Sequence, residues 1–76
     1  MNVEAQIKKI AAEVFFVAEE KIVSGVDFME DFGIDSLTIF EFVQRIEDEF
    51  HLDLNTLGLA PFRSLDSTCE VITSKL

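Results

Sequence analysis

The sequence predicts an all-α fold, a small four-helix bundle with three main helices and one short helix. Apolar residues recur at spacings of three and four, and no stretch alternates apolar and polar residues for long enough to form a sheet. The chain has 76 residues, of which 49% are apolar and 28% charged. A chain of this size buries roughly 60% of its unfolded surface, which allows one compact core. We therefore expect residues 1–76 to form a single ordered domain.

The first main helix is predicted over VEAQIKKIAAEVFFVA, residues 3–18. Asn2 is a favoured capping residue, and Glu4 lies in the first turn, where the helix dipole favours a negative charge. Phe16 and Val17 are expected to widen the apolar face near the helix end. That face consists of Val3, Ile7, Ile10, Ala11, Val14 and Phe15.

Residues 19–35 are predicted to form a long loop, because they show no sustained period and contain Gly25 and Gly33. Loops of this length in compact domains are functional or disordered. Four apolar side chains are expected to anchor the loop in the core, which argues against disorder. These anchors are Ile22, Val26, Phe28 and Phe32.

The second main helix is predicted over residues 36–50, after Asp35 as its capping residue. Its core stripe is expected to be Ile39, Phe42, Val43, Ile46 and Phe50. The opposite side carries Leu37, Phe40, Glu41, Gln44, Glu47 and Asp48. An exposed leucine and phenylalanine beside carboxylates indicate a contact patch for a partner. A second interpretation, in which Phe40 folds down onto the preceding loop, stays open.

The last third is expected to hold a short helical turn and a final helix. The turn is predicted over residues 55–60 and ends before Pro61, which disfavours a helical residue before it. Ser64 is expected to cap the final helix. Its inward residues are expected to be Leu65, Cys69 and Ile72, followed by Leu76. Cys69 is the only cysteine, so it has no partner for an internal disulfide and is interpreted as a small buried apolar residue.

Phenylalanine is expected to supply the bulk of the core. The chain has eight phenylalanines and neither tryptophan nor tyrosine, so these rings carry no polar group that needs a partner. The six expected to point inward are Phe15, Phe28, Phe32, Phe42, Phe50 and Phe62.

The negative charge is concentrated in the middle of the chain. Residues 27–53 contain nine acidic residues against Arg45 alone, which accounts for −8 of the net charge of −9. Such a field repels nucleic acid and attracts partners with basic patches, although a solvated surface would look the same. No apolar run is long enough to span a membrane, and the first ten residues do not resemble a signal peptide. We therefore expect a cytoplasmic protein, and we also expect it to be a monomer.

Asp35, Ser36 and Leu37 form the one constellation with chemical content. The first turn of a helix presents unpaired backbone N–H groups and the positive end of the dipole, so this position suits a bound or attached phosphate. Gly33 is expected to let the preceding chain turn tightly and to keep bulk away from the Ser36 hydroxyl. The pattern indicates that Ser36 is an exposed attachment point for a phosphodiester.

An enzymatic or metal-binding role finds little support in the sequence. No G-x-S-x-G elbow is present. The only histidine, His51, follows the far end of the same helix, roughly 20 Å from Ser36, and is expected to be exposed there. Asp27, Asp31 and Asp35 miss the spacing of a calcium loop, and Cys69 with His51 makes no zinc pattern. We expect no catalytic residue and no metal site.

The stretch FGIDSLTIFEFVQRIEDEF resembles the signature of acyl carrier proteins, in which D-S-L opens the second helix and the serine carries 4′-phosphopantetheine. The resemblance extends over essentially the whole chain. It implies that Ser36 receives the arm from coenzyme A through a phosphopantetheinyl transferase, with Asp35 positioning that enzyme and its metal ion. The arm's thiol would hold an acyl group as a thioester for fatty-acid or polyketide-type synthesis, and the carrier itself performs no chemistry. The surface that partner enzymes read is implied to be Leu37, Phe40, Glu41, Glu47 and Asp48.

Two features depart from the housekeeping fatty-acid carriers of this family. Thr38 stands where those carriers have an acidic residue, and the segment Pro61-Phe62-Arg63 is often missing from them. An aminoacyl or peptidyl carrier is an alternative, although its motif has the form G-G-x-S. A small acidic helical adaptor without a cofactor is a third interpretation.

Overall fold

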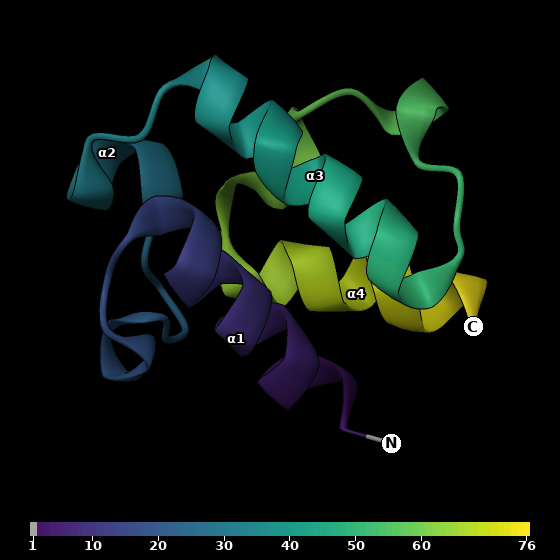
Figure 1. The fold of residues 1–76 in the computed structure, drawn as a ribbon, viewed down its shortest axis with the longest axis horizontal. Coiled ribbons are helices and arrows are strands. Elements are labelled where there is room, and N and C mark those ends of the chain that lie inside the picture. Colours follow the sequence, from purple (N-terminus) through teal and green to yellow (C-terminus); the bar gives the residue numbers. More distant parts are fainter. Residues whose placement is uncertain (1) are drawn as a thin grey trace.

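A computed structural model of the chain describes residues 2–76, and all regular elements in this part are helices, without a strand. Three long helices and one short helix confirm the predicted fold class. The α-helices are α1 (Val3–Phe15), α2 (Phe28–Phe32), α3 (Ser36–Phe50) and α4 (Leu65–Lys75). The 3-10 turns are η1 (Glu19–Lys21), η2 (Asn55–Leu57) and η3 (Ala60–Arg63). α1 packs against both α3 and α4, while η3 packs against α4 and α3 (Figure 1).

The beginning of α1 follows the sequence prediction, but its end does not. The Asn2 Oδ1 atom accepts a hydrogen bond of 3.0 Å from the backbone N–H of Ala5, which caps the helix as expected. The helix ends at Phe15, because Phe16 adopts a left-handed conformation with φ of 58°. This turn directs the Phe16 side chain into solvent, where it is 93% exposed. The prediction that Phe16 widens the apolar face is therefore wrong, whereas Val17 does pack against the core.

The segment predicted as a long loop contains two short helical elements, η1 and α2. The Asp27 carboxylate caps α2 by accepting hydrogen bonds from the backbone N–H groups of Met29 and Glu30. A five-residue helix spans little more than one turn, so it leaves no apolar period to detect. The predicted anchoring holds: Ile22 and Phe28 are fully buried, and Val26 and Phe32 pack against the core.

α3 has the predicted bounds and the predicted core stripe. All five stripe residues are buried: Ile39, Phe42, Val43, Ile46 and Phe50. The helix ends at Phe50, and the next residue, His51, is exposed and adopts a left-handed conformation with φ of 56°. This helix therefore presents one apolar side to α1 and the opposite side to solvent.

The connection from α3 to α4 agrees with its prediction in part, because η2 lies within the short turn predicted over residues 55–60 but ends at Leu57. Pro61 does not end a helical turn but lies in the first turn of η3, where its missing N–H leaves no hydrogen bond unmade. Ser64 caps α4 as predicted, accepting a hydrogen bond of 3.2 Å from the backbone N–H of Ser67. Leu65 and Ile72 are buried and Cys69 is half-buried. Leu76 is 62% exposed, so its predicted inward position is wrong.

Four aromatic rings form a connected cluster in the core. Phe15 lies 4.8 Å from Phe28 and 5.1 Å from Phe42, measured between ring centroids. Phe28 meets Phe42 edge-on at 5.7 Å and stacks on Phe32 at 6.1 Å. Phe50 and Phe62 are also buried. The expectation of six inward rings is confirmed, with Phe32 only partly buried. No helix among residues 2–76 is both long and apolar enough to cross a membrane.

Candidate functional site

Asp35 fixes the beginning of α3. Its Oδ1 atom accepts hydrogen bonds of 2.9 Å from both the backbone N–H and the hydroxyl of Thr38. The backbone hydrogen bond and, after it, the hydroxyl hydrogen bond hold the pKa of the Asp35 carboxyl below its usual value. Thr38, which stands where housekeeping carriers have an acidic residue, therefore donates two hydrogen bonds to the capping carboxylate and fixes its position. The cap is ionised at neutral pH.

Ser36 is the first residue of α3 and is exposed to solvent. Because Asp35 caps the helix, the Ser36 side chain is not required for this purpose. The backbone N–H groups of the first helical turn have no acceptor within the helix, and the Asp35 side chain accepts a hydrogen bond from only one of them, that of Thr38. The amides of Ser36 and Leu37 remain for an anion, at the positive end of the helix dipole. This surrounding fits a phosphate group on the Ser36 oxygen.

Gly33 ends α2 and turns the chain towards Ser36. Its φ of 65° is a left-handed conformation, as the expected tight turn requires. A Cβ atom at this position would meet nothing within 4 Å. The backbone conformation favours glycine here, whereas the expected role in keeping bulk away from the hydroxyl has no steric support.

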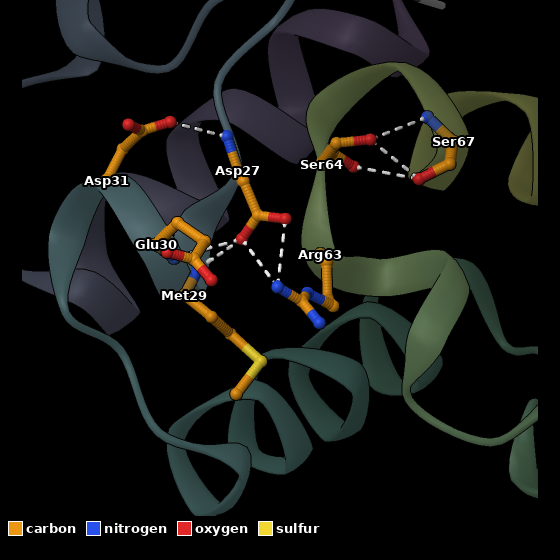
Figure 2. Close-up of polar contacts among 7 residues, drawn as sticks. All are labelled: Asp27, Met29, Glu30, Asp31, Arg63, Ser64 and Ser67. Atoms are coloured by element: carbon orange, nitrogen blue, oxygen red, sulfur yellow. Dashed lines mark hydrogen bonds and ion pairs between the residues drawn. The ribbon is translucent and has the colours of Figure 1, made fainter.

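An ion pair that the sequence did not reveal joins α2 to η3 (Figure 2). The Nη2 atom of Arg63 lies 3.0 Å from the Oδ2 atom of Asp27. The Asp27 backbone N–H donates a hydrogen bond of 2.8 Å to the Asp31 carboxylate. Both the backbone and the side chain of Asp27 are therefore hydrogen-bonded to α2. Hydrogen bonds, first from the Glu30 backbone N–H and then from Arg63, hold the pKa of the Asp27 carboxyl below its usual value. The spacing Asp27-x-x-Glu30 was the available sequence signal for this helix start.

The exposed side of α3 carries most of the predicted partner-binding residues. Leu37 is 67% exposed and Phe40 is 47% exposed. Glu41 and Asp48 are exposed as well. We call Leu37, Phe40, Glu41 and Asp48 the outer face of α3. With almost half of its surface in solvent, Phe40 fits the contact-patch interpretation better than the folded-down one.

Glu47 and Arg45 have structural contacts that no local pattern predicted. The Oε2 atom of Glu47 accepts a hydrogen bond of 2.6 Å from the backbone N–H of Leu54 and so holds the connection after α3 against the helix. The Arg45 guanidinium pairs with the Glu13 carboxylate on α1 at 2.6 Å. The only cation of the acidic middle segment is therefore engaged with α1, and it does not neutralise the outer face.

Other reactive groups stand apart from this site. Burial, and then the charges of Glu4 and Asp66, raise the pKa of the Cys69 thiol. Among residues 2–76, no three His, Cys, Asp or Glu side chains gather closely enough to hold a metal ion.

Comparisons with known proteins identify the family. The model of a family described as "Phosphopantetheine attachment site" matches residues 5–72. An acyl carrier protein of Buchnera aphidicola subsp. Schizaphis graminum is 31% identical over 74 residues, which cover 97% of this chain and 94% of that protein. The polyketide-8 synthase acyl carrier protein 2 of Streptomyces avermitilis is 35% identical over 71 residues, covering 93% of this chain and 82% of that protein. The chain belongs to the acyl carrier protein family.

Proposed function

We propose that Ser36 is the residue of this carrier to which 4′-phosphopantetheine is attached. The protein carries acyl groups on this prosthetic group for fatty-acid or polyketide-type synthesis, and it is not an enzyme. One observation supports the position: Ser36 is an exposed serine at the first residue of α3, next to a cap that Asp35 supplies. We also propose that residues 1–76 form one carrier domain.

When attached, the arm supplies a thiol that holds an acyl group as a thioester. The contribution of the chain is positional. α3 holds the Ser36 hydroxyl in solvent, where a transferase can reach it. The helix dipole and the first-turn amides favour the phosphodiester charge. A tethered acyl group meets successive enzymes at a high effective concentration, which is how a carrier without catalytic residues promotes a pathway.

Loading by a phosphopantetheinyl transferase with magnesium and coenzyme A tests the assignment of Ser36. The wild-type chain should gain the mass of one phosphopantetheine, and peptide mapping should place this mass on Ser36. Ser36→Ala should stay folded and gain nothing, because an exposed hydroxyl contributes little to packing. Ser74→Ala removes another exposed serine, in the last turn of α4, and should load like the wild type.

Two results would contradict the assignment. One is a Ser36→Ala variant that still gains the mass, which would place the arm elsewhere. The other is a wild-type chain that stays unmodified under conditions that load a control carrier.

Partners include a phosphopantetheinyl transferase and the enzymes of the pathway. We propose that those enzymes carry basic patches and bind the outer face of α3. Glu47 adds charge to this surface although one of its carboxylate oxygens is held by Leu54. The monomeric state and the cytoplasmic location stay predictions, which native mass measurement and cell fractionation would test.

A further inference from the structure

We propose that the Thr38 hydroxyl keeps the backbone N–H of Leu37 free, so that this N–H donates a hydrogen bond to the phosphodiester on Ser36. This inference rests on the proposed attachment at Ser36. The carboxylate of Asp35 and the phosphodiester are both anions, and both are favoured at the positive end of the α3 dipole. They therefore compete for the same few N–H donors. A donor that comes from a side chain relieves this competition.

The two aspartate caps of the chain are satisfied by different donors. The Oδ1 atom of Asp27 accepts hydrogen bonds from two backbone N–H groups of α2, that of Met29 at 2.9 Å and that of Glu30 at 3.0 Å. The Oδ1 atom of Asp35 also accepts two hydrogen bonds from its own helix. Both come from Thr38, one from the backbone N–H and one from the hydroxyl, each at 2.9 Å. In α3 a hydroxyl thus takes the place of a second backbone N–H.

The positions of the donors identify the N–H that the hydroxyl replaces. Thr38 and Glu30 each stand three residues after their cap, and an ionised glutamate has no donor. Leu37 and Met29 each stand two residues after their cap, and a capping side chain can accept from either position. Because the Thr38 hydroxyl is the second donor to Asp35, the Leu37 N–H stays out of the cap. Thr38 is thus a positioning residue that acts through Asp35.

The other two helix caps agree with this exchange. The Asn2 side chain is neutral and accepts a single hydrogen bond, from the backbone N–H of Ala5. Ser64 accepts one from the backbone N–H of Ser67, whose hydroxyl lies 2.7 Å from the Ser64 hydroxyl. Among the four α-helices of residues 2–76, the cap that takes two N–H groups is Asp27, which is charged and has no hydroxyl three residues later.

Backbone N–H groups are the donors that the chain offers to a phosphodiester at the start of α3. Both arginines, Arg45 and Arg63, are paired with carboxylates, and every lysine lies outside residues 27–53. Leu37 is 67% exposed, so an anion can approach its backbone from solvent. A phosphate group at a helix start is bound by such N–H groups. The N–H that Thr38 leaves free is therefore of direct use to the arm.

The test follows the Leu37 amide proton by NMR in isotope-labelled protein, before and after a phosphopantetheinyl transferase adds the arm. Intact mass and peptide mapping come first, and a chain without the arm on Ser36 contradicts the proposed function and this inference with it. On loading, the Leu37 proton should move downfield, because it gains an anionic acceptor. The Thr38 amide proton should move less, since it stays on Asp35. A Leu37 proton that moves no further than that of Thr38, with the arm on Ser36, would overturn this inference alone.

Two variants of Thr38 test whether the hydroxyl is the cause. Thr38→Val removes the hydroxyl and keeps the shape of the side chain, so Asp35 should turn to the Leu37 N–H. Without the arm, the Leu37 proton of this variant should lie downfield of its wild-type position, and loading should move it less than half as far. Thr38→Ser keeps the hydroxyl and should behave like the wild type in both forms. Thr73→Val makes the same change at an exposed position of α4 and should leave Leu37 unaffected.

Two results would refute the role of the hydroxyl. One is a Leu37 proton that responds to loading equally in Thr38→Val and in the wild type. The other is a Thr38→Ser variant that behaves like Thr38→Val. Circular dichroism confirms that each variant is folded. Should Thr38→Val fail to fold, the wild-type comparison of the Leu37 and Thr38 protons and the Thr38→Ser variant still decide the proposal.

Discussion

The two sides of α3 differ in what their residues do. The inner side is one unbroken apolar stripe that contacts the rings of α1 and α2. The outer face carries Leu37 and Phe40 among carboxylates and contacts solvent. The inner side therefore contributes to the free energy of unfolding, and the outer face is free to serve recognition. Variants on the two sides should separate these two properties.

Phe42→Ala should have the largest effect on stability. Removing a fully buried phenylalanine costs about 3–5 kcal/mol, a large part of the roughly 5–15 kcal/mol that holds a domain folded. Phe40→Ala is the matched control, because it makes the same change two residues earlier on the outer face and should cost less than about 1 kcal/mol. Urea unfolding followed by circular dichroism measures both values. Equal losses would show that Phe40 belongs to the core.

Asp35→Ala should have a smaller effect that depends on pH. The folded-state pKa of Asp35 lies below its ordinary value of 3.8, so the ionised cap stabilises the folded state above that pH. This contribution disappears as the pH falls through the lowered folded-state pKa. The urea midpoint of Asp35→Ala should thus be lower than that of the wild type at neutral pH, and the difference should shrink as the pH falls below 3.8.

Comparing the variant with the wild type at each pH cancels the titration of Asp27, whose pKa is also lowered. Thr38→Val removes the hydroxyl donor but keeps the backbone donor to Asp35, so it should give a weaker form of the same effect. A difference that stays constant with pH would mean that the carboxylate does not stabilise α3 through its charge.

Glu41→Lys should leave the free energy of unfolding almost unchanged and instead slow acyl transfer to a partner enzyme. Added salt should slow the wild type in the same way, because exposed charges are screened beyond about 8 Å at physiological ionic strength. Glu70→Lys makes the same change of charge on the exposed surface of α4 and should transfer at nearly the wild-type rate. If both variants were equally slow, the net charge rather than the outer face would determine recognition.

The sequence predicted those elements that repeat a pattern over several turns. α1, α3 and α4 each span at least three turns, and their caps at Asn2, Asp35 and Ser64 are strong local signals. α2 and η1 were missed because they are too short to show a period, whereas η2 lies within the short turn predicted over residues 55–60. The exposed Phe16 was missed because a left-handed helix end normally carries glycine or asparagine.

The two ion pairs near the site could not be predicted from the sequence. Asp27 and Arg63 are 36 residues apart, and Glu13 and Arg45 are 32 apart. No local rule pairs residues over such separations, because their meeting depends on how the helices pack. The start of α3 at Ser36 needed only the residues next to it, since a capping aspartate and a helix start are defined within one turn.

The half-buried Cys69 has a consequence for the chemistry that a carrier must survive. A thioester is attacked by thiolates, and a thiol whose pKa is raised by burial is protonated at neutral pH and reacts slowly. The chain thus contains a single sulfhydryl of its own, and that one is a poor nucleophile. An activated acyl group on the arm is therefore not readily lost to the thiol of the protein that carries it.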